Sequence, residues 1–188
     1  MKKNLLIVGA GGHGRCCLDI ARESQRYDEI SFLDDGCVGS IVNGARVLDT
    51  ISNLKNYKKE YQDVFVAIGN NKFRRELQRM ANAEGYCIPT FISDKAYVST
   101  YAIIGKGSVI FPGAVIEANV SIGNGCIVTS NATINHDAIL ESYVLVYSNT
   151  VIRPNTKIKE LARIGSGCVI RFGSTIEFEA DISDGTIV

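Results

Sequence analysis

Aliphatic residues recur at every sixth position through the second half of the chain, without an insertion or a slip. From Ile92 to Ile182, the first residue of each group of six, or hexad, is Ile, Val or Leu. The fifth residue is small, as at Ala114, Cys126 and Cys168. Such regularity indicates an internal repeat, in which the aliphatic residues fill a shared interior and the small residues fit where space is tight.

The fourth residue of most hexads is one that tolerates a positive φ angle. These residues are Gly107, Gly113, Asn119, Gly125, Asn131, Asp137, Asn149, Asn155, Gly167, Gly173 and Gly185. Each hexad therefore predicts a short strand followed by a sharp corner with a left-handed backbone. Residues 91–188 are expected to form an all-β solenoid.

The first half of the chain predicts alternating strands and helices. The segment "NLLIVGAGGHGRCCLDIARES" indicates a strand, a glycine loop and a helix, with Gly9, Gly11 and Gly14 at the G-x-G-x-x-G spacing. Such a loop presents backbone N–H groups and a helix N-terminus to a phosphate. The next strand ends at Asp34 and Asp35, about 20 residues later, where a ribose-binding acid is expected.

A third segment, "DVFVAIGNNKFRRELQRMANAEG", again predicts a strand, a loop and a helix. Residues 1–90 are therefore expected to form a small Rossmann-like α/β domain with a mostly parallel sheet. A full dinucleotide-binding fold needs two mononucleotide halves, so this short domain is expected to bind one nucleotide rather than NAD. The alternative is that the glycine loop is a tight turn that binds nothing.

Composition narrows the choice of partners. The 20 basic residues balance 20 acidic ones, which argues against nucleic acid as the main partner. No apolar run reaches the roughly 18 residues of a membrane span, and the N-terminal apolar stretch is too short for a secretory signal. We therefore expect a cytoplasmic protein whose six cysteines are free thiols.

Taken together, the two halves resemble one family. The glycine loop, "FLDD", "AIGNNKFRREL" and the hexads are similar to those of the bacterial sugar O- and N-acyltransferases, which modify sialic acid and UDP-4-amino-sugars. The resemblance implies a left-handed parallel β-helix with three hexads per coil. It also implies a homotrimer, with acetyl-CoA in the groove between neighbouring subunits. The nucleotide sugar would be held by the N-terminal domain, at Gly11, Gly12, His13, Asp34, Asp35, Asn70 and Arg74.

One of the two histidines lies in the solenoid, in the segment "NATINHDAIL". His136 is third in its hexad, on a corner, and is expected to point away from the interior. The resemblance implies that His136 is the catalytic base, which removes a proton from an amine or hydroxyl as it attacks the thioester. Asp137 would orient the ring. The alternatives are a surface histidine without a role and an aspartate that only suits the corner.

The chain also departs from this family. Many relatives have a second histidine nine residues after the base and an asparagine seven residues before it, where this chain has Leu145 and Thr129. Arg153 and Arg171 are 18 residues, or one coil, apart, so their side chains should lie next to each other on adjacent coils. They are expected to bind an anion such as the phosphates of CoA. The alternative is that they form a face exposed to solvent. A zinc site of the related solenoids needs three histidines, and with one histidine in the solenoid we expect no metal.

Three functions are consistent with these observations. The first is an acetyl-CoA-dependent N-acetyltransferase acting on a UDP- or dTDP-linked 4-amino-sugar in bacterial glycan biosynthesis. The second is O-acetylation of sialic acid or a related sugar, because one base serves both acceptors. The third is a non-catalytic trimeric scaffold that senses a nucleotide. Leu145 favours the scaffold, whereas His136 favours an enzyme.

Overall fold

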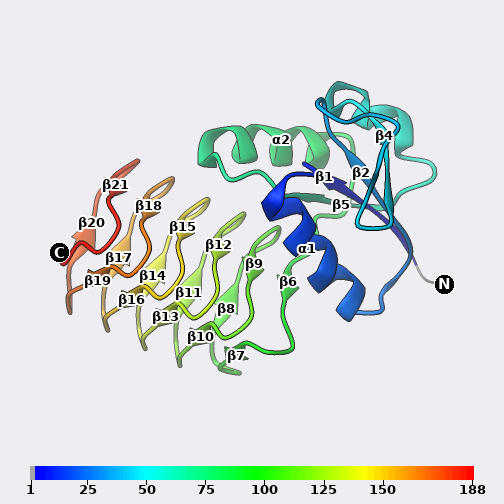
Figure 1. Ribbon diagram of the computed structural model, residues 1–188. Coiled ribbons are helices and arrows are strands. Elements are labelled where there is room, and N and C mark those ends of the chain that lie inside the picture. The colour runs from blue at the N-terminus through cyan, green and yellow to red at the C-terminus, as the bar shows by residue number, and fades with distance from the viewer. Residues whose placement is uncertain (1–2) are drawn as a thin grey trace. The chain divides into compact units, whose positions relative to one another are not determined.

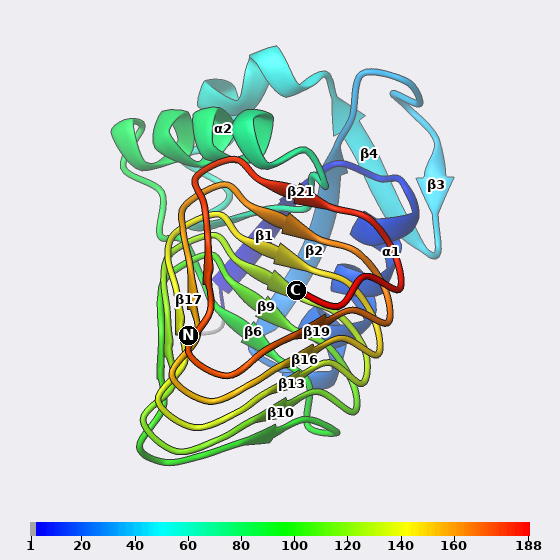
Figure 2. The same ribbon diagram turned by 90° about the vertical axis from the view of Figure 1, so that its left-hand side faces the viewer.

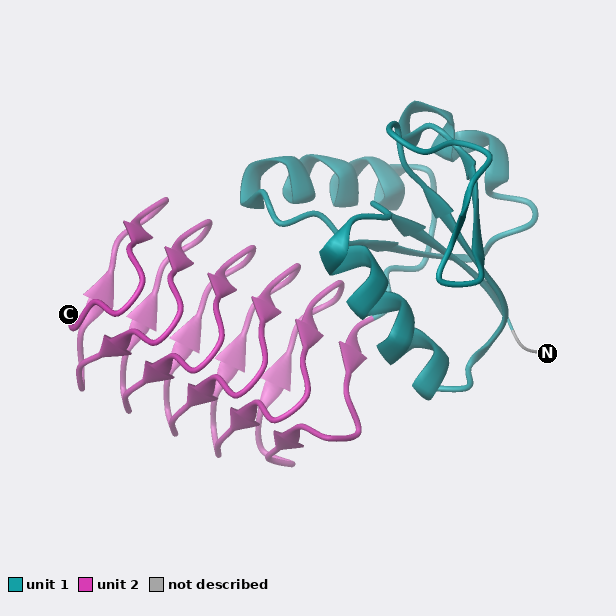
Figure 3. Ribbon diagram, in the orientation of Figure 1, with its two compact units in different colours: residues 1–89 teal, residues 90–188 magenta. Residues whose placement is uncertain are grey.

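The computed structural model describes residues 3–188 of the chain. It consists of two compact units, residues 1–89 and 90–188 (Figure 3). No helix within the described residues is long and apolar enough to cross a membrane. The two units differ in architecture, and each contains one of the regions in which the sequence predicts a site.

The first unit is a mostly parallel sheet with helices (Figure 1). Its strands are β1 (Lys3–Val8), β2 (Tyr27–Leu33), β3 (Ile41–Val42), β4 (Ala45–Asp49) and β5 (Asp63–Val66). Its helices are α1 (Gly12–Glu23), the 3-10 helix η1 (Ile51–Tyr57) and α2 (Asn71–Ala83). The strand order is β3-β4-β2-β1-β5, and only the β3–β4 pair is antiparallel. This arrangement confirms the expected Rossmann-like α/β domain.

Strand β1 lies inside the sheet because its residues are apolar on both faces. Residues 5–8 are almost completely buried, as in parallel strands that are covered on both sides. The carboxyl ends of β1 and β2 lie next to each other, since Val8 pairs with Leu33. The glycine loop and Asp34, which follow these two strands, therefore begin at the same edge of the sheet.

The second unit is a left-handed parallel β-helix, as the resemblance implies (Figure 2). Its two-residue strands are β6 (Phe91–Ile92), β7 (Tyr97–Val98), β8 (Ile103–Ile104), β9 (Val109–Ile110), β10 (Val115–Ile116), β11 (Ser121–Ile122), β12 (Ile127–Val128), β13 (Thr133–Ile134), β14 (Ile139–Leu140), β15 (Leu145–Val146), β16 (Val151–Ile152), β17 (Lys157–Ile158), β18 (Arg163–Ile164), β19 (Val169–Ile170), β20 (Thr175–Ile176) and β21 (Asp181–Ile182). They form three sheets, ordered β19-β16-β13-β10-β7, β20-β17-β14-β11-β8 and β21-β18-β15-β12-β9-β6. Residues 18 apart pair between coils, as Ile116 does with Ile134. Each coil is therefore three hexads.

The first residue of the hexads fills the interior, as predicted. Ile116 and Ile134 are fully buried, and so are Cys126 and Cys168 at the small fifth place. All six cysteines are free. Ile92 is an exception, because 43% of its surface is exposed. It lies in the first coil, which has no earlier coil stacked on it, so the prediction that Ile92 is buried is wrong.

The fourth residue of every hexad from Gly107 to Gly185 has a positive φ angle, which confirms the predicted left-handed corners. Tyr143, Leu161 and Glu179 occupy corners with φ angles of 60°, 64° and 56°. Bulky side chains rarely adopt this conformation on their own. The stacking of the coils, rather than local preference, therefore imposes the corner at these positions.

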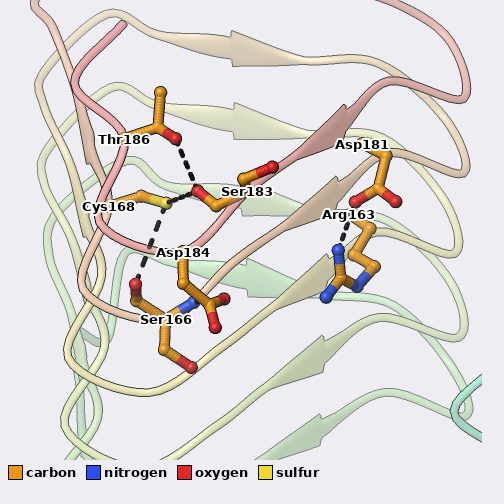
Figure 4. A network of polar contacts seen from close by, with 7 residues as sticks. All are labelled: Arg163, Ser166, Cys168, Asp181, Ser183, Asp184 and Thr186. Carbon is orange, nitrogen blue, oxygen red and sulfur yellow. Dashed lines mark hydrogen bonds and ion pairs between the residues drawn. The ribbon is translucent and has the colours of Figure 1, made fainter.

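Polar contacts between neighbouring coils continue to the C-terminal end of the solenoid (Figure 4). The Asp184 carboxylate accepts a hydrogen bond from the Ser166 backbone N–H at 2.8 Å, across one coil of 18 residues. The buried Cys168 thiol donates to the Ser183 carbonyl at 3.1 Å. Cys168 is therefore a packing residue with a satisfied hydrogen bond.

Candidate active site

His136 and Asp137 form a hydrogen-bonded pair on the corner that follows β13. His136 Nδ1 lies 2.7 Å from Asp137 Oδ2, and about half of the imidazole is exposed. The Asp137 φ angle is 62°, so this aspartate also suits the left-handed corner. Because a carboxylate only accepts hydrogen bonds, Nδ1 carries the proton and Nε2 is the basic atom of the neutral ring.

Three consecutive residues of the preceding coil hold this pair in place. Glu117 Oε2 accepts a hydrogen bond from the His136 backbone N–H at 2.8 Å. The Ala118 carbonyl accepts one from the Asp137 N–H at 3.1 Å, and the Asn119 side chain donates to Asp137 Oδ1 at 3.1 Å. Glu117 and Asn119 were not predicted as site residues, although a coil of 18 residues places residues 117–119 beside residues 135–137.

A groove of about 630 Å³ lies beside the pair. Its lining residues are Tyr97, Ser99, Val115, Glu117, Ala118, Asn119, His136 and Asp137, none of which is lysine or arginine. Hydrogen bonds from the His136 and Asn119 side chains hold the pKa of Asp137 below its ordinary value, so Asp137 is ionised at neutral pH. The groove therefore suits a neutral or positively charged polar molecule, which would lie next to a base.

The glycine loop leads from β1 to the N-terminus of α1. Gly9 has a φ angle of 100°, and a Cβ atom on Gly14 would lie 1.9 Å from the Gly9 carbonyl oxygen. These two glycines are therefore required by the turn itself. A Cβ atom on Gly11 would have no neighbouring atom within 4 Å, and one on Gly12 would meet only the end of the Arg15 side chain, at 3.9 Å. The space beside Gly11 and Gly12, at a helix N-terminus, suits a phosphate.

Asp34 and Asp35 form hydrogen bonds within their own unit. Asp34 accepts from the backbone N–H groups of Ala10 and Gly36, both at 2.8 Å, and Asp35 accepts from the Ile51 N–H at 2.9 Å. Burial by itself would raise the pKa of Asp34, but the hydrogen bonds from Ala10, Gly36 and the Cys37 side chain together outweigh it, and the pKa is lowered. Asp34 thus braces the glycine loop, and Asp35 holds the start of η1.

Asn70 and Arg74 organise the loop between β5 and α2. Asn70 caps α2, since its side chain accepts a hydrogen bond from the Phe73 N–H at 3.0 Å. Arg74 is 1% exposed and donates to the carbonyls of Ile68 and Gly69 at 2.8 and 3.1 Å. Asn70 and Arg74 therefore form hydrogen bonds within the fold, whereas Gly11 and Gly12 leave space beside the glycine loop.

His13 lies in the first turn of α1, one turn before Cys17, with 3.7 Å between His13 Nε2 and the sulfur. Burial, and then the positive charge of Arg74, lower the pKa of His13 to about 4. The imidazole is therefore neutral at pH 7. It can exchange a hydrogen bond with a ligand, but it offers no positive charge to a phosphate.

Arg153 and Arg171 directly follow the paired strands β16 and β19, so the register places them side by side on adjacent coils. Both are exposed, and neither lines the groove beside His136. Across residues 3–188 there is no group of three or more His, Cys, Asp or Glu side chains that could hold a metal ion.

Comparison with known proteins assigns the chain to a family. Residues 4–81 match the PglD N-terminal domain, and residues 101–136 match the six-repeat bacterial transferase hexapeptide model. The chain is 36% identical to the solved acetyltransferase domain of PglB from Neisseria gonorrhoeae FA1090, with a TM-score of 0.95. This match covers 100% of the chain and 91% of that domain structure. The chain belongs to the PglD-like family of hexapeptide sugar acyltransferases.

Other relatives differ in ligand and length. The PglB domain has also been solved with acetyl coenzyme A, at 37% identity over 100% of this chain and 96% of that one, with a TM-score of 0.91. PerB from Caulobacter crescentus, solved with CoA and GDP-perosamine, is 26% identical, over 98% and 88% of the two chains, with a TM-score of 0.91. Uncharacterized protein L142 of Acanthamoeba polyphaga mimivirus is 28% identical over 123 residues, or 65% of this chain, which spans 24% of that protein's length.

Membership of the PglD-like family confirms the family predicted from the motifs. The glycine loop falls within the PglD-type match, and His136 is the last residue of the hexapeptide match. Leu145 is 3% exposed. In this PglD-like chain, its side chain is therefore buried and has no group that could bind a polar ligand.

Proposed function

We propose that this PglD-like protein is an acetyl-CoA-dependent N-acetyltransferase that acts on a UDP- or dTDP-linked 4-amino-sugar, with His136 as the general base. The observation that carries the proposal is the 2.7 Å contact between His136 Nδ1 and Asp137 Oδ2 at the edge of a groove. The relatives support it, because the PglB domain binds acetyl coenzyme A and PerB binds CoA together with GDP-perosamine.

In the proposed reaction, Nε2 of His136 takes a proton from the acceptor nitrogen as that nitrogen attacks the carbonyl carbon of the acetyl thioester. A C–N bond forms, and the tetrahedral intermediate collapses as the C–S bond breaks. The imidazolium then returns its proton to the CoA thiolate. The ionised Asp137 stabilises the imidazolium between these two proton transfers, because the opposite charges are in direct contact.

The charge of the groove supports an amine as the acceptor. Glu117 and Asp137 both line it, without a lysine or arginine among the lining residues. At neutral pH an amino-sugar arrives mainly as an ammonium ion, which two carboxylates attract and which loses one proton to solvent before the free amine attacks the thioester, whereas the carboxylate of a sialic acid would be repelled. We therefore favour N-acetylation of an amino-sugar over O-acetylation of an acidic sugar.

We place the nucleotide sugar at Gly11 and Gly12 and the acetyl-CoA phosphates near Arg153 and Arg171. Gly11 and Gly12 leave space at the N-terminus of α1, which has the electrostatic character that a diphosphate prefers. The two arginines lie on adjacent coils, where their like charges favour a shared anion. His13, Asp34, Asp35, Asn70 and Arg74 would shape the nucleotide site, mostly through the loops that they hold.

We also propose that the active form is a homotrimer. Tyr97, Tyr101 and Ile103 lie close together in the sequence at the start of the solenoid and are 62%, 76% and 70% exposed. Exposed apolar side chains of this size favour a protein partner. Tyr97 also lines the groove, so a neighbouring subunit that covers Tyr97 would enclose the acceptor. Sedimentation velocity measures the assembly directly.

Thermal unfolding tests the nucleotide assignment. A UDP- or dTDP-amino-sugar at about 100 times its Kd should raise the Tm by roughly 5–10 °C, whereas NAD should not raise it. Gly11→Ala should remove the shift with the sugar but keep the shift with acetyl-CoA, because its Cβ fits the folded chain yet fills the space proposed for a phosphate. Stabilisation by NAD and by no nucleotide sugar, including a GDP-sugar, would refute the assignment.

Steady-state kinetics test the role of the groove's charge. Glu117→Gln keeps an oxygen that accepts the His136 N–H but removes the negative charge. We expect KM for the amino-sugar to rise about 3–10-fold with kcat nearly unchanged. Glu141→Gln is the matched control, because Glu141 likewise accepts from a backbone N–H 19 residues later, that of Glu160, and does not line the groove. An equal effect of both variants would contradict the charge argument.

A further inference from the structure

The corner of His136 and Asp137 is joined to the previous coil by a side-chain contact in addition to the backbone ladder. The Asp137 backbone N–H donates to the Ala118 carbonyl, and equivalent backbone bonds occur at other corners, such as that from Gly173 to Pro154. The bond from Asn119 Nδ2 to Asp137 Oδ1, at 3.1 Å, is a further link. This link involves the carboxylate itself, not only the backbone that carries it.

Both oxygens of the Asp137 carboxylate are thereby engaged. Oδ1 accepts from Asn119, and Oδ2 accepts from His136 Nδ1. A carboxylate held at one oxygen can still rotate about its Cβ–Cγ bond, whereas one held at both oxygens keeps its plane. Since the imidazole bonds to that plane, the orientation of Nε2 and the position of the ring proton depend on Asn119.

The corner does not by itself require an asparagine at this place. Asn119 has a φ angle of 61°, which glycine adopts without strain. Asn155, at the equivalent corner two coils later, has a φ angle of 56° and forms no side-chain hydrogen bond within residues 3–188. Asn119 therefore provides an amide group beyond what its turn needs, and this group is directed at Asp137.

We propose that Asn119 is a positioning residue of the active site, which acts through Asp137 to fix the tautomer and orientation of His136. The inference rests on the proposed function, in which His136 Nε2 takes the acceptor proton. The other titratable groups that line the groove are Glu117 and Tyr97. Glu117 binds the His136 backbone N–H, so it holds the corner in the absence of Asn119.

Two substitutions separate positioning from folding. Asn119→Gly keeps the left-handed corner and removes the amide, so kcat should fall about tenfold with little change in KM. Asn155→Gly is the matched control and should leave kcat unchanged. In an Asp137→Asn background, Asn119→Gly should cause no additional loss, because the residue through which it acts is already altered.

Asn119→Asp tests the same link by charge. A second carboxylate beside Asp137 stabilises the imidazolium, so the midpoint of the His136 titration should move to higher pH. The acidic limb of the kcat/KM profile, which reports loss of the neutral base, should move in the same direction. Asn119→Gly should instead mix the two ring tautomers of neutral His136.

Nitrogen-15 NMR of the imidazoles measures both effects without acetyl transfer. The chain has two histidines, and the pKa of His13 is lowered to about 4, so the His136 signals can be followed alone. An unchanged tautomer and titration in Asn119→Gly and Asn119→Asp would overturn the proposal, as would an equal loss of kcat in Asn155→Gly. If the tautomer changes but the wild-type protein transfers no acetyl group, the proposed function fails and the positioning role stands.

Discussion

Replacement of His136 with alanine is expected to lower kcat for acetyl transfer by about 10²–10⁴-fold while the fold stays intact. The imidazole is half exposed, and its main structural contact is with the neighbouring Asp137. The backbone N–H that binds Glu117 is kept in the variant. The loss should therefore appear in the rate of proton transfer and not in the stability of the solenoid.

Release of the CoA thiol from acetyl-CoA in the presence of a UDP- or dTDP-amino-sugar measures this loss. Ser130→Ala is a suitable control, since Ser130 is also third in its hexad, next to a left-handed corner at Asn131. The control should retain wild-type kcat, and both variants should unfold at the wild-type temperature. Near-normal turnover by His136→Ala would end the proposed mechanism and favour the nucleotide-sensing scaffold.

Gly14→Ala is expected to destabilise the first unit by about 3 kcal/mol or more. The added Cβ would lie 1.9 Å from the Gly9 carbonyl oxygen and 2.9 Å from its carbon. Both are backbone atoms, so α1 and the end of β1 would have to move apart. Because this contact sets the shape of the glycine loop, stabilisation by a nucleotide sugar should be lost as well.

Gly12→Ala is the matched control, in the same helix and two residues earlier. Its Cβ would meet only the end of the Arg15 side chain, at 3.9 Å. Alanine is favoured over glycine in a helix by up to about 1 kcal/mol, so this variant should be as stable as the wild type or slightly more so. Urea unfolding followed by circular dichroism compares the two, and equal effects would contradict the role assigned to the Gly9–Gly14 contact.

The solenoid could be predicted in detail because its interior obeys a simple period. Every sixth residue is aliphatic, and the register that pairs Ile116 with Ile134 follows from three hexads per coil. The corners at Tyr143, Leu161 and Glu179 could not be read in this way, since none of these residues prefers a positive φ angle. There the neighbouring coils determine the backbone, and the local sequence gives no signal.

The candidate site was only partly predictable. The positions of His136 and Asp137 came from the motif, but the contacts of Glu117 and Asn119 with them cross from one coil to the next. In the first unit, the sequence placed Asp35 correctly after the second strand. It could not indicate that the Asp35 carboxylate is occupied by the Ile51 backbone N–H, because that depends on how the loops meet.

The strict period of the solenoid also limits how this half of the gene can change in length. A gain or loss of 18 codons keeps every row of side chains on its own face, whereas any other number shifts all later residues to a different face or corner. An added coil between residues 119 and 136 would separate Asn119 from Asp137. Under the proposed function, lengthening there should therefore lower activity, whereas a coil added before residue 117 or after residue 137 keeps the contacts of His136 and Asp137 with the previous coil.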